Sequence, residues 1–320
     1  TRILGGADSA SPRYIHTELN KLMDVIYPLE DMPLLEYLDD DGMLVEPKYY
    51  VPIIPMVLIN GMNGIGTGFS TMIPKFNPLD VVDNIRRKLK KQPYKVIHPW
   101  YNNHKGKIIE VGTDEYISKG CYQILDNTTL EITELPIGVW TDNYKKFLDG
   151  LIYGKTKKEH TNCKKPKYIM DYENNSSDKE VYFKIKMPQG MVQSLQWSED
   201  KYIDGIERFF KLTVTKGLSK RNMHLYNSEG KIVKYKSITD IYEEFYPVRY
   251  KLYEDRKEYR LNELEREIDM LQMKVRFIED VINEKIIIYR QKKEKIISDL
   301  YENKYYQIND KIVIKDIKKE

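Results

Sequence analysis

The sequence predicts an α+β fold with more than one domain and a long coiled-coil helix at its C-terminal end. Three observations lead to this prediction. The chain has 320 residues, roughly twice the length of a common single domain. Short strand-like and helix-like patterns alternate through residues 81–246. From residue 247 onward the apolar residues follow a heptad repeat instead.

The N-terminal region, residues 1–80, mixes turn signals with apolar runs. A Ser-Pro pair with helix-start chemistry predicts a helix over residues 12–26. The run DDDG at residues 39–42 predicts a turn. The proline-punctuated apolar run of residues 49–59 predicts an extended, buried segment, which leads directly into the glycine-rich residues 60–68.

The middle region alternates short elements and therefore predicts an α+β domain. Apolar residues recur there with helical spacing in some stretches and with a period of two in others. The predicted helices cover residues 78–91 and 140–151, and the predicted strands cover residues 106–111, 129–136 and 181–186. Residues 155–168, KTKKEHTNCKKPKY, predict a basic loop.

The last third predicts one long helix. Pro247 is typical of a helix start, and the apolar positions that follow are spaced alternately by three and four residues. A helix over residues 248–302 would be roughly 80 Å long. Its apolar seam needs a partner, either a returning helix or a second subunit. The seam residues are Leu261, Leu264, Ile268, Leu271, Val275, Ile278 and Ile282.

Composition excludes several classes of protein. Charged residues make up 32% and hydrophobic residues 41% of the chain, which argues against a wholly disordered protein. No apolar run is long enough for a membrane span. The two cysteines, Cys121 and Cys163, and five unclustered histidines predict neither a disulfide framework nor metal ligands. The chain starts without Met or a signal-like apolar stretch, so we expect a fragment of a longer protein.

A candidate nucleophile lies near the N-terminus, where Arg13 precedes Tyr14. A phenol has a pKa near about 10, and an adjacent guanidinium favours its ionised form. The same arginine could neutralise charge on a phosphoryl transition state. The alternative is coincidence, because tyrosine and basic residues are abundant and Arg249-Tyr250 is a second such pair.

A glycine-rich loop, residues 61–68, is the second candidate site. It matches neither a dinucleotide-binding fingerprint nor a P-loop. Gly64 and Gly66 flank Ile65 and permit close approach of the backbone to a partner. Ile65 could then enter a base step as an apolar wedge and kink a duplex. The alternative is an irregular turn after a buried strand.

A basic run at residues 86–95 is the third candidate, with six cations in ten residues and no acid. Such a run can contact phosphates with salt-sensitive affinity. The alternative is a solvated helix face, and the basic loop of residues 155–168 has the same two interpretations. The cations of the run are Arg86, Arg87, Lys88, Lys90, Lys91 and Lys95.

Together these residues resemble the DNA-cleaving region of eukaryotic-type type IIA DNA topoisomerases (topoisomerase II). The resemblance is carried by GGADSASPRYIHTEL, by VEPKYYVPIIPMVLINGMNGIGTGFSTMIPKFNP and by LEITELPIGVWTDNYK. It implies that Tyr14 forms a 5′-phosphotyrosyl bond, that Arg13 assists phosphate chemistry and that Ile65 intercalates into DNA. It also implies the C-terminal part of a winged-helix domain at residues 1–52, a tower domain at residues 53–246 and a coiled-coil arm at residues 247–320.

The resemblance further implies a homodimer that binds double-stranded DNA, with one Tyr14 in each protomer, and no membrane association. In the family, Mg²⁺ is bound by a TOPRIM domain and ATP by a GHKL domain, neither of which this sequence contains. We therefore expect the fragment to bind DNA without cleaving it. The AT-rich coding bias is similar to that of members from large cytoplasmic DNA viruses, which implies the host cytoplasm; a cellular member implies the nucleus.

Two alternatives remain open. A non-catalytic, coiled-coil dimeric DNA-binding architectural protein explains the basic runs and the heptads equally well, but under that hypothesis Tyr14→Phe changes only local packing. A coiled-coil scaffold leaves the basic run of residues 86–95 unexplained. DNA binding that depends on those cations would separate the scaffold from the other two hypotheses.

Overall fold

The computed structural model describes residues 1–153, 168–215, 218–305, 307–308 and 314–315. The predicted basic loop lies outside the described residues except for Tyr168. The α+β fold class is confirmed, since helices and antiparallel sheets both contribute to the structure.

Chain contacts divide the protein into two compact units. The first combines Thr1–Pro28 with Tyr50–Arg249, and the second combines Leu29–Tyr49 with Tyr250–Glu320. The domain limits after residues 52 and 246 come from the family resemblance rather than from compactness, so they stay a prediction.

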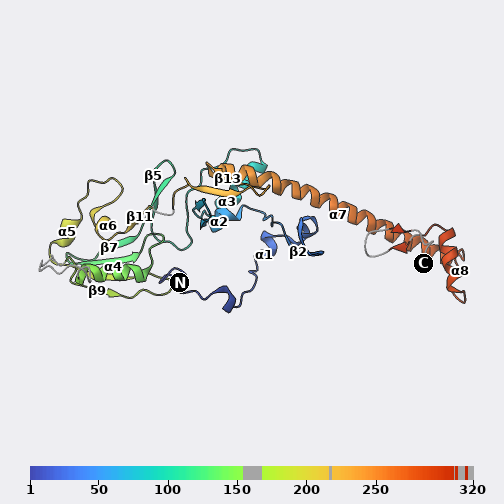
Figure 1. Cartoon of the computed structure of the whole chain (residues 1–320), viewed down its shortest axis with the longest axis horizontal. Helices are drawn as coiled ribbons and strands as arrows, with labels where there is room; N and C mark the ends of the chain where they lie inside the picture. The colour runs from blue at the N-terminus through green and yellow to red at the C-terminus, as the bar shows by residue number, and fades with distance from the viewer. Residues whose placement is uncertain (154–167, 216–217, 306, 309–313, 316–320) are drawn as a thin grey trace. The chain divides into compact units, whose positions relative to one another are not determined.

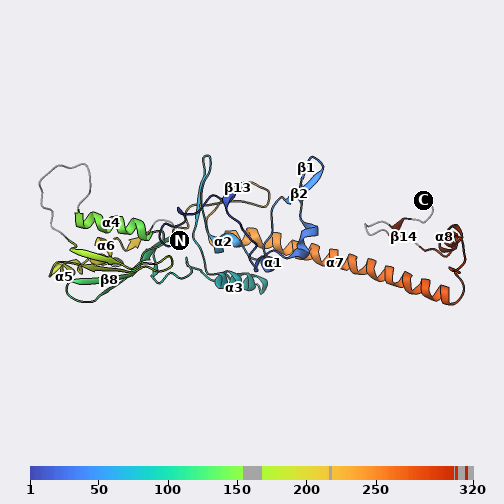
Figure 2. The ribbon, with the colours of Figure 1, turned by 90° about the horizontal axis from the view of Figure 1, so that it is seen from below.

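The first unit contains an antiparallel sheet in the order β7-β8-β10-β9. Inward residues alternate along β8, where Leu130, Ile132 and Glu134 are buried, as expected for a strand with one face in the core. Helix α4 covers a face of this sheet (Figure 2), and Tyr144 of α4 packs edge-on against Phe183 of β10. These elements are β7 (Cys121–Ile124), β8 (Thr129–Glu134), β9 (Asp171–Asn174), β10 (Phe183–Lys186) and α4 (Thr141–Tyr153).

A smaller antiparallel sheet in the order β11-β6-β5 belongs to the same unit. Two short helices complete this part of the chain, and α6 begins with a reciprocal capping box between Asp204 and Glu207. The elements are β5 (Ile108–Gly112), β6 (Glu115–Lys119), β11 (Thr213–Val214), α5 (Met191–Leu195) and α6 (Gly205–Phe209). The helices and strands predicted for the middle region are thus confirmed, with ends shifted by a few residues.

A second hydrophobic cluster in the first unit joins two hairpins to three helices. Its buried residues include Leu58, Ile73, Val81, Met223 and Tyr242. The contributing elements are α2 (Met56–Asn60), β3 (Met62–Ile65), β4 (Ser70–Ile73), α3 (Pro78–Leu89), β12 (Met223–Tyr226), β13 (Ile232–Tyr235) and the start of α7 (Ile238–Ile282). This cluster positions the glycine-rich loop and the basic run.

Two predictions for the N-terminal region are wrong. The expected helix over residues 12–26 is replaced by a 3-10 turn, η1 (Pro12–Tyr14), and by α1 (Met23–Ile26). Every residue from 4 to 22 is exposed, so no tertiary packing supports a helix there, and an isolated helix of this length is marginal in water.

The second wrong prediction concerns the apolar run, where residues 56–60 form α2 rather than an extended segment. The run is also less buried than predicted, since only Pro55 and Leu58 of residues 49–59 are buried. Pro55 provides the N-cap of α2, a position that tolerates a missing N–H. A short apolar run cannot be assigned to strand or helix from periodicity alone.

The second unit contains η2 (Leu29–Leu34) and the hairpin β1 (Tyr37–Asp40)–β2 (Met43–Pro47). The turn predicted at residues 39–42 is confirmed: Asp41 and Gly42 both have positive φ, at 51° and 85°, as a two-residue hairpin turn requires. The remaining elements are the later turns of α7, α8 (Lys293–Glu302), β14 (Gln307–Ile308) and β15 (Ile314–Lys315).

Helix α7 is long and continuous (Figure 1), but its ends differ from the prediction. It begins well before Pro247, because Ser237 and Asp240 cap it reciprocally: the Asp240 N–H donates to Ser237 Oγ and the Ser237 N–H donates to Asp240 Oδ2. Pro247 lies inside the helix, where its missing N–H removes a single backbone bond.

The C-terminal end of α7 explains why the helix does not reach residue 302. Glu284 adopts φ 59°, the Lys285 N–H donates to the Asp280 carbonyl at 2.8 Å and the Glu284 N–H donates to the Val281 carbonyl at 3.1 Å. This pair of bonds is the Schellman motif that ends helices. The heptad seam residues are all exposed, so the partner predicted for the seam is not found among the described residues.

Candidate nucleic-acid interface

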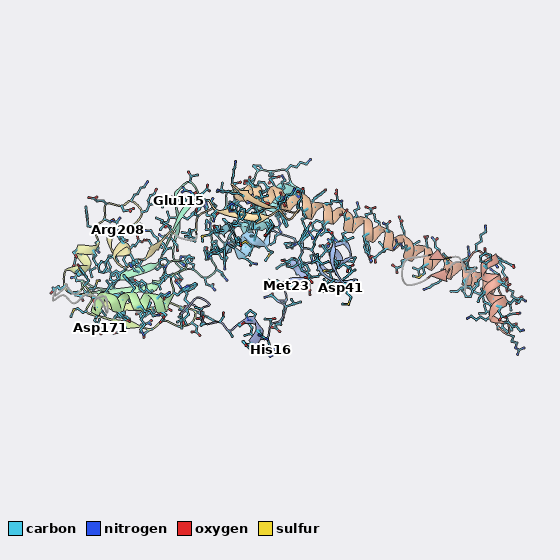
Figure 3. The ribbon with its side chains drawn as sticks, in the orientation of Figure 1. His16, Met23, Asp41, Glu115, Asp171 and Arg208 are labelled. Carbon is cyan, nitrogen blue, oxygen red and sulfur yellow. The ribbon has the colours of Figure 1, made fainter. Side chains whose placement is uncertain are left out.

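Tyr14 and Arg13 lie on η1, whose geometry is set by the preceding serine and proline. Pro12 occupies the first position of the turn, and the Tyr14 N–H donates to the Ser11 carbonyl at 2.9 Å. The Tyr14 side chain is 77% exposed. Neither Tyr14 nor Arg13 forms a side-chain hydrogen bond or ion pair with any other described residue. His16, two residues beyond Tyr14, is also exposed on this segment (Figure 3). The phenol is therefore accessible to a large ligand.

Ile65 ends β3 at the tip of the β3–β4 hairpin and is 92% exposed. The connecting residues 66–69 are closed by a bond from the Gly66 N–H to the Phe69 carbonyl at 2.8 Å. Gly68 has φ +78° and Gly61, at the base of the hairpin, has φ +66°. Gly64 and Gly66 do not have positive φ. Of the apolar side chains on the hairpin, Ile65 is the most exposed, ahead of Phe69 and Met62.

Strand β12 and Asn222, the residue before it, support this hairpin at several points. The Met72 N–H donates to the Asn222 carbonyl at 2.7 Å, and Asn222 Nδ2 donates to Ser70 Oγ at 2.9 Å. The ring of His224 contacts that of Phe69 edge-on at 5.9 Å. These contacts hold the hairpin in one conformation, so the position of Ile65 is better defined than it would be on a free loop. Such rigidity suits a side chain that enters between stacked nucleobases.

The basic run begins within α3, which starts at an Asn77 cap with Pro78 in the first position. Lys88 faces α7, where its ammonium lies 2.7 Å from both carboxylate oxygens of Glu243. Lys88 also lies over the ring of Tyr94 at 5.7 Å and over that of Tyr246 at 5.6 Å. These contacts give Lys88 a role within the protein.

The other cations of the run divide into two groups. Arg87 pairs with Asp83 at 2.8 Å, and this bond lowers the pKa of the Asp83 carboxyl. Lys95 lies 3.5 Å from Asp80. The three remaining cations form no ion pair with the described residues; they are Arg86, Lys90 and Lys91.

Two of the three predicted features, the glycine-rich loop and the basic run, are attached to the same hydrophobic cluster. The hairpin of Ile65 and helix α3 both pack into the cluster that contains Ile73 and Val81. The segment of Tyr14 is fixed elsewhere in the first unit, because Arg2 pairs with Glu134 at the end of β8. No hydrogen bond or ion pair joins Tyr14 to the hairpin or to α3 within the described residues.

Sequence reasoning missed Glu134 as a functional candidate. It is buried and pairs with Arg2, and it lies 3.9 Å from the imidazole of His104. A signal was available, because Glu134 shares its strand face with the apolar Leu130 and Ile132, and a carboxylate on a buried strand face needs a partner. The identity of that partner, 132 residues earlier in the chain, has no local signal.

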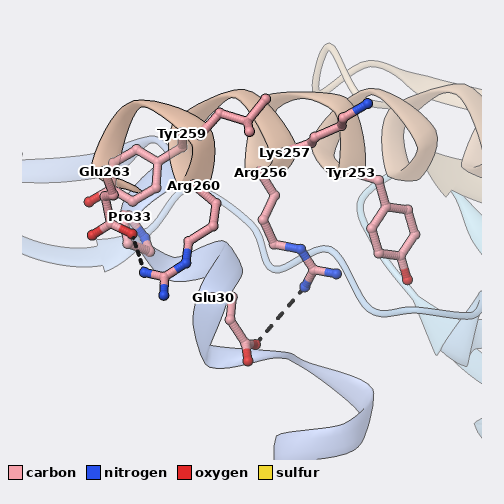
Figure 4. Close-up of a pocket in the computed structure, with 9 residues that line it drawn as sticks. Glu30, Pro33, Tyr253, Arg256, Lys257, Tyr259, Arg260 and Glu263 are labelled. Carbon is pink, nitrogen blue, oxygen red and sulfur yellow. Dashed lines mark hydrogen bonds and ion pairs between the residues drawn. The ribbon is translucent and has the colours of Figure 1, made fainter. Parts of the chain in front are cut away.

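The second unit contains a cavity of about 760 Å³. Arg256 lies 4.0 Å from Glu30 and Arg260 lies 2.8 Å from Glu263 within it (Figure 4). Two of its three basic residues thus pair with its two acids, and Lys257 is the third base. Its lining residues are Glu30, Pro33, Tyr253, Arg256, Lys257, Tyr259, Arg260, Leu261 and Glu263.

Metal-binding and membrane-spanning features are both missing from the described part of the chain. There, no group of three or more His, Cys, Asp or Glu side chains gathers closely enough to hold a metal ion. Among the same residues, no helix combines the length and the apolar character that a membrane crossing requires.

Relatives of this chain are DNA topoisomerases. The DNA topoisomerase 2 of Plasmodium falciparum is 40% identical over 316 residues, which is 99% of this chain and 21% of that protein. The Arabidopsis thaliana enzyme is 40% identical over 94% of this chain and 20% of its own length. The DNA topoisomerase 2 of Acanthamoeba polyphaga mimivirus is 36% identical over 95% of this chain and 28% of its own length. The chain thus spans between 20% and 28% of the length of these relatives.

A solved structure is similar over the whole chain. It is the crystal structure of the Plasmodium falciparum topoisomerase II DNA-binding, cleavage and re-ligation domain, with a TM-score of 0.83 and 39% identity, covering 100% of this chain and 40% of that one. The family model for the A subunit of DNA gyrase/topoisomerase IV matches residues 1–320. The resemblance noted in the sequence is thereby confirmed, and the chain belongs to the DNA gyrase/topoisomerase IV A-subunit family.

Proposed function

We propose that this chain is the DNA-cleaving and resealing core of a type II DNA topoisomerase. The observation that carries the proposal is the full-length match to a DNA-binding, cleavage and re-ligation domain at 39% identity. Because a fold alone does not define a function, the site has to agree as well. Tyr14 agrees: it is exposed, it follows Arg13 and it has no competing partner among the described residues.

Tyr14 would act as the nucleophile in a transesterification. Its phenolic oxygen forms a bond to a DNA phosphorus, and the bond from that phosphorus to the 3′ oxygen breaks. The phenol loses a proton and the 3′ oxygen gains one, so a phosphodiester replaces a phosphodiester and the break can be resealed. The guanidinium of Arg13 would neutralise charge that develops on the phosphate oxygens.

We assign DNA contacts to the braced hairpin and to α3. Ile65 would enter a base step, while Gly64 and Gly66 permit the duplex to approach the backbone on either side. Arg86, Lys90 and Lys91 would contact phosphates, since they form no ion pair with the described residues. Arg87 could join them by leaving Asp83. We assign Lys88 to the packing of α3 on α7.

Type II cleavage and strand passage imply Mg²⁺ and ATP. The described residues do not fit a metal site, because no acidic cluster is found among them. We therefore propose that both cofactors bind parts of the enzyme that correspond to the relatives' remaining length. No chemical step assigned to this chain depends on a metal ligand of its own.

The proposal includes the partners, the domains and the compartment. A homodimer on double-stranded DNA would place one Tyr14 on each strand, and the exposed heptad seam would contribute to a coiled coil. Residues 1–52 would belong to a winged-helix domain, residues 53–246 to a tower and residues 247–320 to the coiled-coil arm. A viral source would put the enzyme in the host cytoplasm, and a cellular source in the nucleus.

The test uses the full-length protein that contains this sequence, as wild type and as Tyr14→Phe. Each is mixed with supercoiled DNA and Mg²⁺ and then quenched with denaturant. Protein attached covalently to 5′ DNA ends is measured. We expect an adduct from the wild type and none from Tyr14→Phe, with DNA affinity unchanged.

Other outcomes contradict parts of the proposal. An adduct that survives in Tyr14→Phe would show that another residue is the nucleophile. If neither protein forms an adduct while both bind DNA in a salt-dependent manner, the chain belongs to a non-cleaving DNA-binding protein instead.

A further inference from the structure

Arg2 is largely buried at the end of β8, although residues 4–22, which follow shortly after it, are exposed. Its Nη2 atom donates to Glu134 Oε1 at 3.0 Å, and the two side chains are 17% and 9% exposed. The same guanidinium donates to the carbonyls of Leu135, at 3.2 Å, and of Val139. Buried charges persist only when they are paired and hydrogen-bonded, so this position of Arg2 is specific.

Glu134 has a full set of partners around this pair. Its Oε1 accepts from the Leu135 N–H at 2.9 Å and its Oε2 accepts from the Lys105 N–H at 3.3 Å. His104 lies 3.9 Å from Oε2, but burial lowers the pKa of this imidazole, which disfavours its charged form. Arg2 therefore supplies the positive charge that balances Glu134.

Backbone bonds hold the same residues to the start of α4. The Arg2 carbonyl accepts from the Thr141 N–H at 3.4 Å and from Thr141 Oγ1 at 3.3 Å. The Ile3 carbonyl accepts from the Asp142 N–H at 3.2 Å. The first N–H groups of a helix need acceptors from outside the helix, and residues 2 and 3 provide them here.

Gly5 completes the attachment by packing closely against Trp140. It has φ +64°, and a Cβ atom at this position would lie only 1.9 Å from the indole ring. The guanidinium of Arg2 lies 5.5 Å from the centroid of the same ring. We call Arg2, Ile3 and Gly5 the N-terminal anchor.

The N-terminal anchor is the upstream attachment of the segment that carries Tyr14. Residues 4–22 are exposed. The next attachment downstream is a bond from the Ile53 N–H to the Ile26 carbonyl at 2.9 Å. Tyr14 thus lies between two fixed ends, and its range of positions depends on both.

We propose that Arg2, held by Glu134, is a positioning residue for Tyr14. The inference rests on the proposed role of Tyr14 as the nucleophile. Reaction between bound groups depends on how often they meet in the right geometry, and a longer free segment explores more conformations. Loss of the N-terminal anchor therefore slows strand cleavage and leaves DNA affinity nearly unchanged, because neither Arg2 nor Glu134 is available to DNA.

The experiment compares Arg2→Met, Arg2→Lys and Glu134→Gln with wild type in the full-length protein. The matched control is Lys119→Met, because Lys119 pairs with Glu207 at 2.7 Å and these side chains are 16% and 7% exposed. The control pair lies in the same unit and does not touch the N-terminal anchor. The readouts are the single-turnover rate of covalent adduct formation at saturating DNA, the Kd for DNA and the thermal midpoint.

We expect Arg2→Met to lower the rate of adduct formation by about tenfold or more with a Kd within about twofold of wild type. Arg2→Lys should recover most of the rate, since an ammonium can still pair with Glu134. Lys119→Met should lower the thermal midpoint to a similar degree without changing the rate. Amide hydrogen exchange of residues 9–22 should accelerate in Arg2→Met and in Glu134→Gln but not in Lys119→Met. If Arg2→Met does not fold, Glu134→Gln carries the same expectation.

Two results would overturn the inference. In one, Arg2→Met and Glu134→Gln form adduct at the wild-type rate. In the other, Lys119→Met is slowed as much as they are, which would mean that general stability is responsible. Tyr14→Phe, included in parallel, separates this failure from failure of the proposed function: a wild-type adduct that does not depend on Tyr14 refutes both, whereas a Tyr14-dependent adduct insensitive to Arg2 refutes only the positioning role.

Discussion

The ammonium of Lys88 lies 2.7 Å from both carboxylate oxygens of Glu243 and joins α3 to α7. Lys88, which the sequence predicted as a DNA contact, is therefore paired with a carboxylate of the protein itself. Two tyrosine rings flank the ammonium, so the side chain is also restricted laterally. The basic run therefore contains one cation that stabilises the packing of α3 on α7, Lys88, and others that are free to contact DNA phosphates.

Lys88→Met and Lys90→Gln should consequently affect different properties, the first stability and the second DNA binding. We expect Lys88→Met to lower the free energy of unfolding by up to about 1 kcal/mol, because the pair is only partly shielded from water, and to leave DNA binding unchanged. Lys90→Gln should leave stability unchanged and reduce the slope of log K against log salt by about one. Urea unfolding and DNA titrations at several salt concentrations measure these effects. A normal salt slope in Lys90→Gln would remove Lys90 from the interface.

The pair also predicts a pH dependence. The bond from Lys88 lowers the pKa of the Glu243 carboxyl below its ordinary value of 4.5. A lowered folded-state pKa contributes stability that is present above the unfolded pKa and lost as the pH falls through the folded value. The destabilisation by Lys88→Met should therefore be constant near neutral pH and shrink below about pH 4.5. A difference that grows on acidification would contradict this assignment.

Ile65→Ala tests the hairpin. Because Ile65 is 92% exposed, its truncation should leave the free energy of unfolding unchanged. If the side chain enters a base step, the bend of bound DNA should decrease, and cleavage should fall by about tenfold since a kinked duplex has to be formed without the wedge. Fluorescence energy transfer between the ends of a short duplex measures the bend. Ile232→Ala, on exposed β13, is the control and should change neither quantity.

Tyr144→Phe tests the core beneath α4. The buried Tyr144 hydroxyl donates to the Phe210 carbonyl at 2.8 Å. Removing this donor leaves a buried acceptor unpaired, which should cost about 1–2 kcal/mol of unfolding free energy. Tyr226→Phe, at an exposed tyrosine, should cost nothing measurable. Equal stability of the two variants would mean that solvent replaces the lost bond.

Glu284→Gly tests the end of α7. Glu284 has φ 59°, a conformation that costs an L-residue about 1 kcal/mol and costs glycine almost nothing. The substitution should raise the stability of the last turns by up to about 1 kcal/mol. Glu279→Gly, a few residues earlier within the helix, should lower stability by about the same amount. Hydrogen exchange of the Lys285 amide measures both; faster exchange in Glu284→Gly would argue against the Schellman end.

Local chemistry made much of the fold predictable. The Asn77-Pro78 start of α3, the Asp41-Gly42 turn and the alternation through Leu130 and Ile132 all encode structure within a few neighbouring residues. The heptad likewise predicted a long helix. Its ends were missed because Pro247 was taken as a start, whereas the reciprocal Ser237–Asp240 cap determines where the helix begins.

The site was predictable only in part. The sequence identified Tyr14, Ile65 and the cations of the basic run from their local motifs, and their roles stay predictions. The partners of these residues depend on the folded chain: Lys88 meets Glu243 across 155 residues, and Arg2 meets Glu134 across 132. The spacing of residues in the sequence does not predict pairs that are so far apart along the chain. The prediction of a helix over residues 12–26 was wrong for a related reason. Local sequence favoured a helix there, but no tertiary contact stabilises one.

The contact between Gly5 and Trp140 gives the protein an optical probe of its own. The indole of Trp140 is half-buried and is covered by the N-terminal anchor, whereas Trp100 and Trp197 are already exposed to solvent. Release of the anchor would admit water to one indole and shift its emission to longer wavelength. The intrinsic fluorescence of the unlabelled protein can therefore follow attachment of the Tyr14 segment in real time during binding of a duplex.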